Sequence, residues 1–332
     1  MISELLPHIE SELKKQIARL DQPRTHHFHE MLTYHMGWTG EGAGPEATGK
    51  RIRPLLVLLT SAACGSEWLR AKPAAAAVEL VHNFSLVHDD IQDNSPKRRG
   101  RATVWAKWGA PMAINVGDAL FVISNQAIID LAKDYPAEIV LKAAGILHDT
   151  CLDLTRGQFL DMSYEERTDL TVEDYWPMIA GKTSALISAC THIGALLGNA
   201  NEETQIAYRL FGHHLGLAFQ VQDDILGIWG NEALTGKSAA SDLVEGKNSL
   251  PVLFALGKGG KFAKRWKQGP ITHDEVPMVA QMLEIEGSKE YAEKMAQSET
   301  EQALRNMEKA NPCGKAGDTL LELTNKLLKR EQ

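Results

Sequence analysis

The sequence has few cysteines, and none of them are closely paired. The four cysteines, Cys64, Cys151, Cys190 and Cys313, are far apart along 332 residues. This pattern lacks the Cys-x-x-Cys spacing of a zinc site and disfavours a disulfide framework. Reduced, buried thiols of this kind predict a cytoplasmic protein.

Positive charge is not in excess either. The 35 Lys and Arg residues are outnumbered by 43 Asp and Glu residues, which gives a formal net charge of −8. Broad nucleic-acid binding needs clustered cationic surface to hold the phosphate backbone. We therefore predict that the protein does not bind nucleic acid.

Linkers, a secretion signal and an uninterrupted apolar span are also missing. No Pro-, Gly- and Ser-rich stretch divides the chain, which predicts a single domain over residues 1–332. The N-terminal segment carries acids early and lacks the basic-then-apolar order of a secretion signal. The most apolar stretches, 112–132 and 183–200, are interrupted by Asp118 and His192, so we expect buried core helices and no stable membrane insertion.

Helical periodicity is what the sequence does have. Long runs rich in Ala, Leu, Ile and Met, with few alternating β-branched segments, predict an all-α fold. One stretch, 37–54, breaks the pattern with five glycines and two prolines and is expected to be a loop before a buried helix from about Pro54. The lengths of the segments between such breaks favour a helical bundle with short connections.

Three aspartates close one apolar helical run. Asp89, Asp90 and Asp93 follow AAAAVELVHNFSLVH. Positions i and i+4 of a helix share a face, so Asp89 and Asp93 can direct two carboxylates at one point. Mg²⁺ relieves the repulsion between such groups and keeps coordination positions for water and substrate phosphate. A solvated helix end is the alternative, and for one acidic run alone it is the more common case.

A second acidic pair favours the metal interpretation. Asp223 and Asp224 follow another apolar run, GLAFQVQ. Two acidic clusters facing each other across a helical cavity would form a multi-metal site that neutralises a strongly anionic group. Lysine and arginine side chains flank both clusters and together suit a diphosphate. These basic residues are Lys50, Arg51, Arg53, Lys97, Arg98, Arg99, Arg101, Lys182, Lys237 and Lys247.

A histidine-rich segment, THHFHEMLTYH (25–35), has several imidazoles. Their spacing does not match a metal site on one clear helix face, so we interpret the segment as structural.

Five ordered motifs resemble those of the trans-isoprenyl diphosphate synthase family. They are GKRIRP (49–54), HNFSLVHDDIQD followed by RRGR (82–101), GQFLDM (157–162), GKTS (181–184) and FQVQDDILGIWG (219–230). The resemblance implies a helical bundle around a deep central cavity, a homodimer and Mg²⁺ as cofactor. It also implies head-to-tail condensation of isopentenyl diphosphate with an allylic diphosphate, the reaction of the short-chain geranylgeranyl and farnesyl diphosphate synthases.

The family pattern assigns roles to matching positions. Asp89, Asp93 and Asp223 resemble the magnesium ligands, with Asp224 in support, and Arg98 resembles a residue that binds the allylic diphosphate. The positions for isopentenyl diphosphate are Lys50, Arg53, His82 and Arg99. The remaining allylic-side contacts are Lys182, Thr183, Gln220, Lys237 and Lys247, although the spacing of Lys247 differs slightly from the pattern.

The implied chemistry is ionisation, condensation and proton loss. Cations stabilise the charge on the departing diphosphate, which can then accept the proton. Thr183 and Gln220 would stabilise the allylic cation, and apolar walls would keep water away from it. One motif departs from the family: DDxxD is common, but this chain reads DDILG, with Gly227 as the last residue. We expect activity to be retained, because Asp223 matters most by resemblance.

Product length is expected to depend on the helix before Asp89. Phe84 and Val81 should meet the growing hydrocarbon tail, whereas Ser85 is small. By resemblance, a single aromatic residue at position 84 suits geranylgeranyl products, and a second at position 85 would favour farnesyl. A purely core-filling role for Phe84 is the alternative.

Three other functional classes stay open. A non-catalytic regulatory subunit should lack acids or cations at one site, and here only the third acid of the second motif is missing. A terpene cyclase needs no second diphosphate, so the isopentenyl set argues against it. A plain helical scaffold would show no metal-dependent ligand binding.

Overall fold

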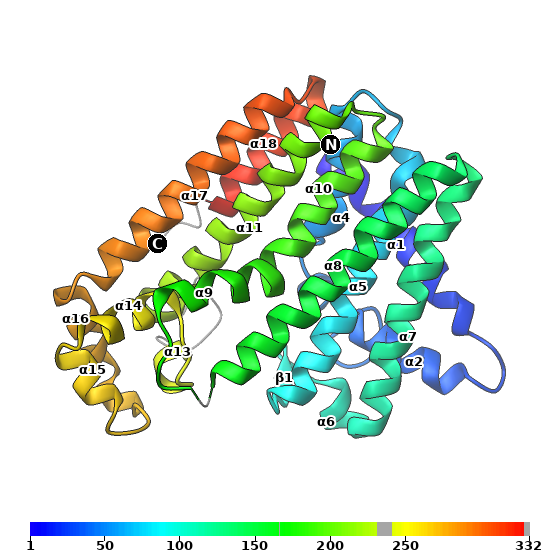
Figure 1. Ribbon diagram of the computed structural model, residues 1–332. Helices are drawn as coiled ribbons and strands as arrows, with labels where there is room; N and C mark the ends of the chain where they lie inside the picture. The colour runs from blue at the N-terminus through cyan, green and yellow to red at the C-terminus, as the bar shows by residue number, and fades with distance from the viewer. Residues whose placement is uncertain (166, 231–240, 329–332) are drawn as a thin grey trace. The chain divides into compact units, whose positions relative to one another are not determined.

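The computed structural model describes residues 1–165, 167–230 and 241–328. Helices make up nearly all of the regular structure in these residues, so the predicted all-α fold is confirmed (Figure 1). The described strands form one two-stranded antiparallel hairpin, β1 (Lys97–Arg98) and β2 (Arg101–Ala102).

Within each described range, the helices follow one another through short connections. Up to the middle of the chain they are α1 (Ile2–Ile17), η1 (Ala18–Leu20), α2 (His26–His35), α3 (Pro45–Thr48), α4 (Ile52–Ala63), η2 (Trp68–Ala71), α5 (Lys72–Gln92), α6 (Val104–Trp108), α7 (Ala110–Ile129), η3 (Asp130–Lys133) and α8 (Ala137–Tyr164). The later ones are α9 (Val172–Ile179), η4 (Ala180–Ser184), α10 (Ala185–Leu197), α11 (Glu202–Trp229), α13 (Ser241–Val244), α14 (Leu250–Lys258), α15 (Lys261–Trp266), η5 (His273–Glu275), α16 (Val276–Ile285), α17 (Ser288–Ala310) and α18 (Gly314–Leu328).

The chain forms two compact units. Unit 1 comprises Met1–Asp149, Cys190–Gln205 and Pro312–Leu320, and unit 2 comprises Thr150–Ala189, Ile206–Asn311 and Leu321–Gln332. A single domain over residues 1–332 stays a prediction.

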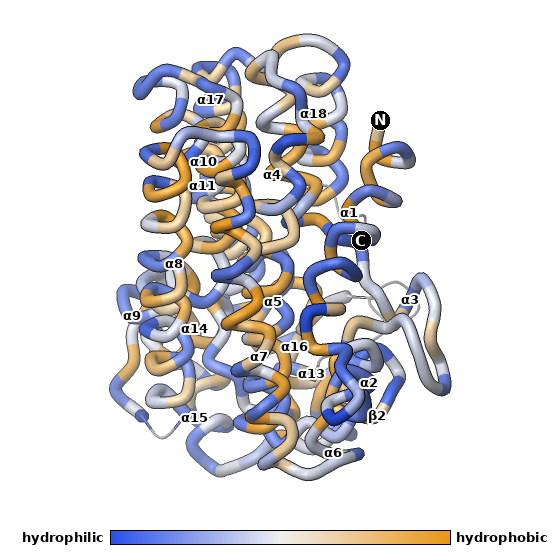
Figure 2. The backbone as a smooth tube through the Cα atoms, turned by 90° about the vertical axis from the view of Figure 1, so that its right-hand side faces the viewer, coloured by the Kyte–Doolittle hydropathy of each residue, from blue (hydrophilic) through white to orange (hydrophobic). Residues whose placement is uncertain are grey.

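In unit 1, α5 is the helix around which the core is built. It packs against α7, α4 and α1, and its four consecutive alanines, 74–77, are almost completely buried. Small side chains at these positions let neighbouring helices approach closely. Gly117 of α7 serves the same purpose, because a β-carbon there would lie 2.1 Å from Nε2 of His88 on α5. Hydrophobic residues, drawn in orange in Figure 2, run through both helices.

The apolar helix α7 is a helix of the protein core, as predicted. Among the described residues, Ala110–Lys133 is the stretch long and apolar enough to be considered as a membrane span, and 44% of its most apolar window is buried. Its buried face includes Ala113, Leu120 and Ala127, and it packs against α5. Ile114, Val122 and Ile129 lie on an exposed face of the same helix.

In unit 2, the core forms around α9, α11, α14 and α17. Tyr175, Val221, Leu250 and Ala292, one from each helix, belong to one buried cluster. This packing fixes the middle of α11, the segment that leads into Asp223.

The glycine-rich stretch is a loop for most of its length, as predicted. The structure adds the short helix α3 inside it, and α4 begins at Ile52, two residues before the predicted start. Pro54 therefore lies in the first turn of α4, where its missing N–H leaves no hydrogen bond unmade.

Candidate active site

The residues predicted to form the site are divided between the two units. Those of GKRIRP, the first acidic cluster and RRGR belong to unit 1, whereas those of GQFLDM, GKTS and the second acidic cluster belong to unit 2.

The first acidic cluster closes α5. Asp93 is the residue after the last helical position, and its backbone N–H donates to the carbonyl of Asp89 at 2.8 Å. The helix therefore continues just far enough to keep Asp89 and Asp93 on one face, as predicted. Two carboxylates so spaced offer oxygen donors only, and this donor set fits Mg²⁺.

Asp90 has a different environment. It is only 2% exposed and accepts a hydrogen bond from Nε of Arg98 at 2.8 Å. Burial raises the pKa of Asp90 to about 6, although the Arg98 charge opposes this shift. Asp90 therefore anchors Arg98, the residue that the family resemblance assigns to the allylic diphosphate.

Arg98 and its neighbours are held by a tight hairpin. Arg98 pairs with Arg101 across β1 and β2, and the two residues between them, Arg99 and Gly100, have φ of 50° and 73°. Positive φ at both central positions is the requirement of a type I′ turn. Arg99 thus adopts an uncommon backbone conformation for a residue with a side chain.

The hairpin contacts the GKRIRP loop through Arg99. Its NH1 donates to the carbonyl of Ala47 at 2.8 Å, and a β-carbon on Gly49 would lie 2.7 Å from its NH2. With φ of 76° and ψ of 178°, Gly49 also has a backbone conformation that only glycine adopts readily. Two motifs distant in sequence are therefore in direct contact.

Arg53, His82 and Arg99 form one electrostatic cluster. Burial lowers the pKa of His82 well below its usual value, and the charges of Arg53 and Arg99 add to this effect. Nε of Arg53 is buried and has no hydrogen-bond partner among the described residues. Three of the four residues predicted for isopentenyl diphosphate are thus brought together; the fourth, Lys50, is exposed next to Gly49.

Arg51 of the same motif is a structural residue. Its side chain is 1% exposed and pairs with Glu10 at 2.6 Å and with Glu79 at 2.8 Å. The positive charge of Arg51, unlike those of its sequence neighbours Lys50 and Arg53, is therefore neutralised by two carboxylates inside the protein.

His35 was not identified as a site residue from the sequence. Burial lowers its pKa to about 3, and the charges of Arg98, Arg99 and Arg51 contribute. His35 also lines a small cavity of about 20 Å³ together with Asp90, Arg98 and Arg99. No feature of the histidine-rich segment distinguishes this imidazole from its neighbours.

In unit 2, a close contact between two glycines aligns GQFLDM with GKTS. A β-carbon on Gly157 would lie 2.1 Å from the backbone nitrogen of Lys182, and one on Gly181 would lie 2.6 Å from the carbonyl of Asp153. Because neither position has room for a side chain, α8 approaches η4 closely. Lys182 then forms an ion pair with Asp161 of GQFLDM.

GKTS itself lies in a π-helical turn. The turn, η4, follows α9, which contains Pro177. π-Helical turns are rare and occur often at functional sites. In this turn Thr183 donates from Oγ1 to Oε1 of Gln220 on α11 at 2.7 Å.

A hydrogen-bonded chain extends from Thr183 to the interior. Nε2 of Gln220 donates to Oδ1 of Asp224 at 3.0 Å, and the hydroxyl of Tyr175 donates to Oδ2 at 2.7 Å. The backbone N–H of Leu250 donates to the same Oδ2 at 3.0 Å. Asp224 is 6% exposed, and burial raises its pKa to about 7. Both of its carboxylate oxygens accept hydrogen bonds inside the protein, whereas the adjacent Asp223 is only half-buried.

Of the two remaining lysines of the predicted site, Lys247 is among the described residues and Lys237 is not. Nζ of Lys247 pairs with Asp242 at 3.4 Å and with Glu245 at 2.7 Å. Burial opposes the charge of this lysine, but both carboxylates raise its pKa. Lys237 lies outside the described residues.

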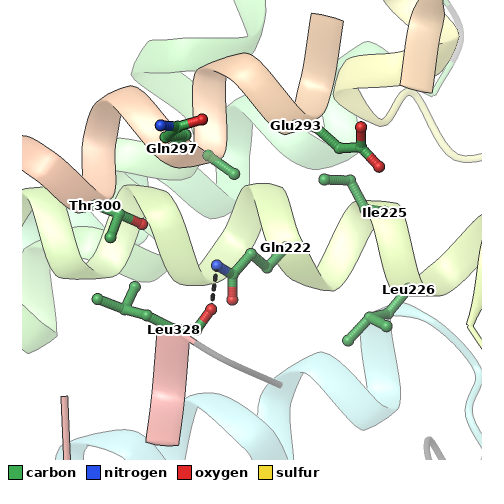
Figure 3. A pocket seen from close by; sticks show the side chains of 8 residues that line it. Gln222, Ile225, Leu226, Glu293, Gln297, Thr300 and Leu328 are labelled. Atoms are coloured by element: carbon green, nitrogen blue, oxygen red, sulfur yellow. Dashed lines mark hydrogen bonds between the residues drawn. The ribbon is translucent and has the colours of Figure 1, made fainter. Parts of the chain in front are cut away.

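A larger cavity in unit 2 does not belong to this site. It has a volume of about 250 Å³ and is lined by α11, α17 and the end of α18 (Figure 3). Gln222 reaches it and donates to the carbonyl of Leu328 at 2.5 Å. Gln222, Ile225 and Leu226 lie on the face of α11 opposite to Gln220 and Asp224, because successive residues are rotated by about 100°.

The histidine-rich segment shows a grouping that its spacing did not reveal. Donor atoms of Asp21, His26 and His29 lie within 4.8 Å of one another. The His26–Asp21 ion pair, with 3.0 Å between Nδ1 and Oδ1, raises the pKa of His26 and lowers that of Asp21. The missing member was Asp21, which precedes the segment.

The residues predicted to set product length lie on α5 beside α7. The rings of Phe84 and Phe121 have centroids 5.1 Å apart and are inclined by 58°. Val81 is fully buried, and Ser85 bonds back to the carbonyl of His82 at 2.9 Å. Phe121, which the sequence did not single out, is therefore the nearest aromatic partner of Phe84 in unit 1.

Comparison with known proteins identifies the family of the chain. Residues 44–283 match the family model described as polyprenyl synthetase. The chain is 38% identical over 302 residues to the (2E,6E)-farnesyl diphosphate synthase of Mycobacterium tuberculosis, covering 88% of this chain and 82% of the relative. It is also 38% identical over 308 residues to the geranylgeranyl diphosphate synthase of the same strain, covering 91% and 86%.

The fold comparison points the same way. The crystal structure of geranylgeranyl pyrophosphate synthetase from Pyrococcus horikoshii superposes with a TM-score of 0.89 at 32% identity, over 99% of this chain and 97% of that one. The polyprenyl synthetase from Streptomyces coelicolor gives a TM-score of 0.86 at 34% identity, over 97% of each chain. The chain therefore belongs to the polyprenyl synthetase family of trans-prenyltransferases.

Proposed function

We propose that this prenyltransferase joins isopentenyl diphosphate to allylic diphosphates in a Mg²⁺-dependent reaction and that its main product is geranylgeranyl diphosphate. The observation that carries the reaction is the combination of two aspartate clusters with separate groups of basic residues. One group contains the Arg53 and Arg99 cations and the imidazole of His82, which its lowered pKa keeps neutral and able to hydrogen-bond. This group suits a second diphosphate that a terpene cyclase would not need.

In this proposal the carboxylates of both clusters would hold the metal ions that neutralise the allylic diphosphate. Asp89, Asp93 and Asp223 would hold Mg²⁺, which when bound supplies positive charge to the departing diphosphate. Arg98, Lys182, Lys237 and Lys247 would neutralise the remaining phosphate charge. The allylic carbon–oxygen bond then breaks, and the electron pair leaves with the diphosphate.

Other residues would guide the condensation. Thr183 and Gln220, held by their mutual hydrogen bond, present oxygen dipoles to the allylic cation. The double bond of isopentenyl diphosphate, fixed by Lys50, Arg53, His82 and Arg99, attacks this cation and forms the new carbon–carbon bond. A proton is then lost to the departed diphosphate, so the reaction demands no side-chain base.

The product length is supported by the pair of rings on α5 and α7. The ring centroids of Phe84 and Phe121 are 5.1 Å apart, and together the two rings would block the tail of a growing chain. Overall similarity does not decide the question, since identity to the farnesyl and geranylgeranyl enzymes of one organism is the same 38%.

The test is an assay of the purified protein alone, with Mg²⁺, labelled isopentenyl diphosphate and each allylic primer in turn. We expect geranylgeranyl product from wild type, longer products from Phe84→Ala and farnesyl product from Ser85→Phe. Phe254→Ala, which removes a ring stacked on Tyr291 at 4.1 Å in unit 2, is the control and should not change length. No turnover without a partner would instead support a regulatory subunit, and unchanged length in Phe84→Ala would remove the ring assignment.

We also infer that the protein is a cytoplasmic homodimer. Ile114, Val122 and Ile129 form an exposed apolar row along one face of α7, and Leu141 of α8 in the same unit is exposed as well. Such rows mark association surfaces. Val122→Glu should shift the sedimentation coefficient to that of a monomer, whereas Ile285→Glu, at a side chain that is even more exposed, should not. An unchanged coefficient in Val122→Glu would contradict the dimer surface.

A further inference from the structure

The glycine that ends DDILG lies beside another carboxylate. A β-carbon on Gly227 would be 2.1 Å from Oδ2 and 2.6 Å from Cγ of Asp242. The carboxyl group of Asp242 therefore occupies the space into which a side chain at position 227 would project. A residue larger than glycine at position 227 would push it away.

Position 227 has a defined relation to the proposed metal ligand Asp223. The two positions are four residues apart on α11, so they share a helix face. Asp89 and Asp93, at the end of α5, have the same spacing. The carboxylate of Asp242, which belongs to α13, thus lies where an acidic side chain at position 227 would lie. With Asp223 it forms a pair comparable to Asp89 and Asp93.

The carboxylate of Asp242 is buried and lies among other charged groups. Asp242 is 6% exposed, and it contributes with Asp223 to raising the pKa of Tyr175, after the larger effect of burial. The negative charges of both carboxylates therefore act on the same phenol. Nζ of Lys247 provides a positive charge 3.4 Å from Oδ1 of Asp242. A metal ion could bind the Asp242 carboxylate beside this lysine or in its place.

We propose that Asp242 is the third carboxylate of the second metal cluster and takes the place of the aspartate that many family members have at position 227. The proposal rests on the proposed function, since it assigns a further residue to the same magnesium site. It explains why DDILG is compatible with activity, and it makes glycine at position 227 a requirement of this chain.

Metal binding tests the proposal directly. Mn²⁺ affinity would be measured by electron paramagnetic resonance in the presence of inorganic diphosphate, together with the Mg²⁺ dependence of the initial rate. Asp242→Asn should weaken metal affinity at least about tenfold. Glu245→Gln is the matched control, because it removes the other acid that pairs with Lys247 and should leave the affinity within about twofold of wild type.

A swap variant removes the ambiguity of a folding defect. Gly227→Asp combined with Asp242→Gly moves the carboxylate onto α11 and should restore Mn²⁺ affinity over Asp242→Asn. If Asp242→Asn binds Mn²⁺ as tightly as Glu245→Gln, or if the folded swap variant binds no better than Asp242→Asn, the proposal is wrong. A wild type that forms no condensation product would refute the proposed function instead, whereas normal condensation with unchanged metal affinity in Asp242→Asn would refute this inference alone.

Discussion

The hydroxyl of Tyr175 donates a 2.7 Å hydrogen bond to Oδ2 of Asp224, and both side chains are buried. Burial keeps the phenol protonated by raising its pKa well above its usual value, so it acts as a donor. Asp224 in turn accepts from Gln220. The carboxylate next to the proposed metal ligand is therefore a positioning group for the amide that faces Thr183.

Tyr175→Phe should lower kcat without changing the KM for isopentenyl diphosphate. The loss of one hydrogen bond to a buried carboxylate costs about 1–3 kcal/mol, and if this loosens Gln220 in the transition state, the rate falls roughly tenfold. Steady-state kinetics on both substrates check this. Tyr291→Phe, at a ring stacked on Phe254, is the control. A Tyr175→Phe enzyme with wild-type kcat but reduced stability would show that the bond is only structural.

Arg53→Gln should raise the KM for isopentenyl diphosphate and leave the KM for the allylic substrate unchanged. Nε of Arg53 is buried without a partner among the described residues, so this guanidinium is available to an anion. Loss of charge-assisted hydrogen bonds of about 1.5–3 kcal/mol predicts an increase of roughly 10- to 100-fold.

Arg51→Gln is the contrasting variant for that experiment. Arg51 is paired with Glu10 and Glu79, and its removal should destabilise the fold by about 3–5 kcal/mol. Equal increases in both KM values for Arg53→Gln would contradict the assignment of Arg53 to one substrate.

Gly49→Ala should weaken isopentenyl diphosphate binding by displacing Arg99. The new β-carbon would lie 2.7 Å from NH2 of Arg99. Gly65→Ala is a matched control, because Gly65 also has positive φ, but a β-carbon added there would have no atom within 4 Å. Both variants should lose stability, and the extra rise in KM should be confined to Gly49→Ala. A similar KM in the two variants would mean that Arg99 does not contact the substrate.

His35→Gln should make the protein less sensitive to acid. Burial lowers the pKa of His35 from 6.5 to about 3, so the unfolded chain binds a proton that the folded chain does not. This contribution to stability is complete above pH 6.5 and is lost as pH falls toward 3, by about 1.4 kcal/mol per pH unit.

Urea unfolding at pH 7.5 and 5.0 measures the effect of that substitution. Wild type should lose about 2 kcal/mol more than His35→Gln over this interval. His27→Gln, at an exposed imidazole, should behave as wild type does. The same loss in His35→Gln and wild type would exclude a buried neutral imidazole.

The sequence was sufficient for features that depend on neighbours along one helix. Helical periodicity predicted the all-α fold, and the i, i+4 spacing predicted that Asp89 and Asp93 share a face. The irregular 37–54 segment was also recognised from its glycines and prolines. Each of these follows from local geometry, which a single sequence encodes directly.

Contacts between distant segments could not be derived in this way. Nothing in DDILG indicates that Asp242 lies against Gly227, and nothing in GKTS indicates that Gly181 meets Gly157. Arg51 and Arg53 are two residues apart and equally basic, yet only Arg51 forms ion pairs with Glu10 and Glu79. Such differences arise from tertiary packing, which sets the partner of each charge.

The most direct test of the account is a double-mutant cycle on Asp89→Asn and Asp223→Asn, measured as the Mg²⁺-dependent affinity for an unreactive allylic diphosphate analogue. If both aspartates act through metal ions on one diphosphate, the two losses should be strongly non-additive, with a coupling of at least about 1 kcal/mol. Losses that add to within about 0.5 kcal/mol would mean that the two clusters act independently, and the account would be contradicted.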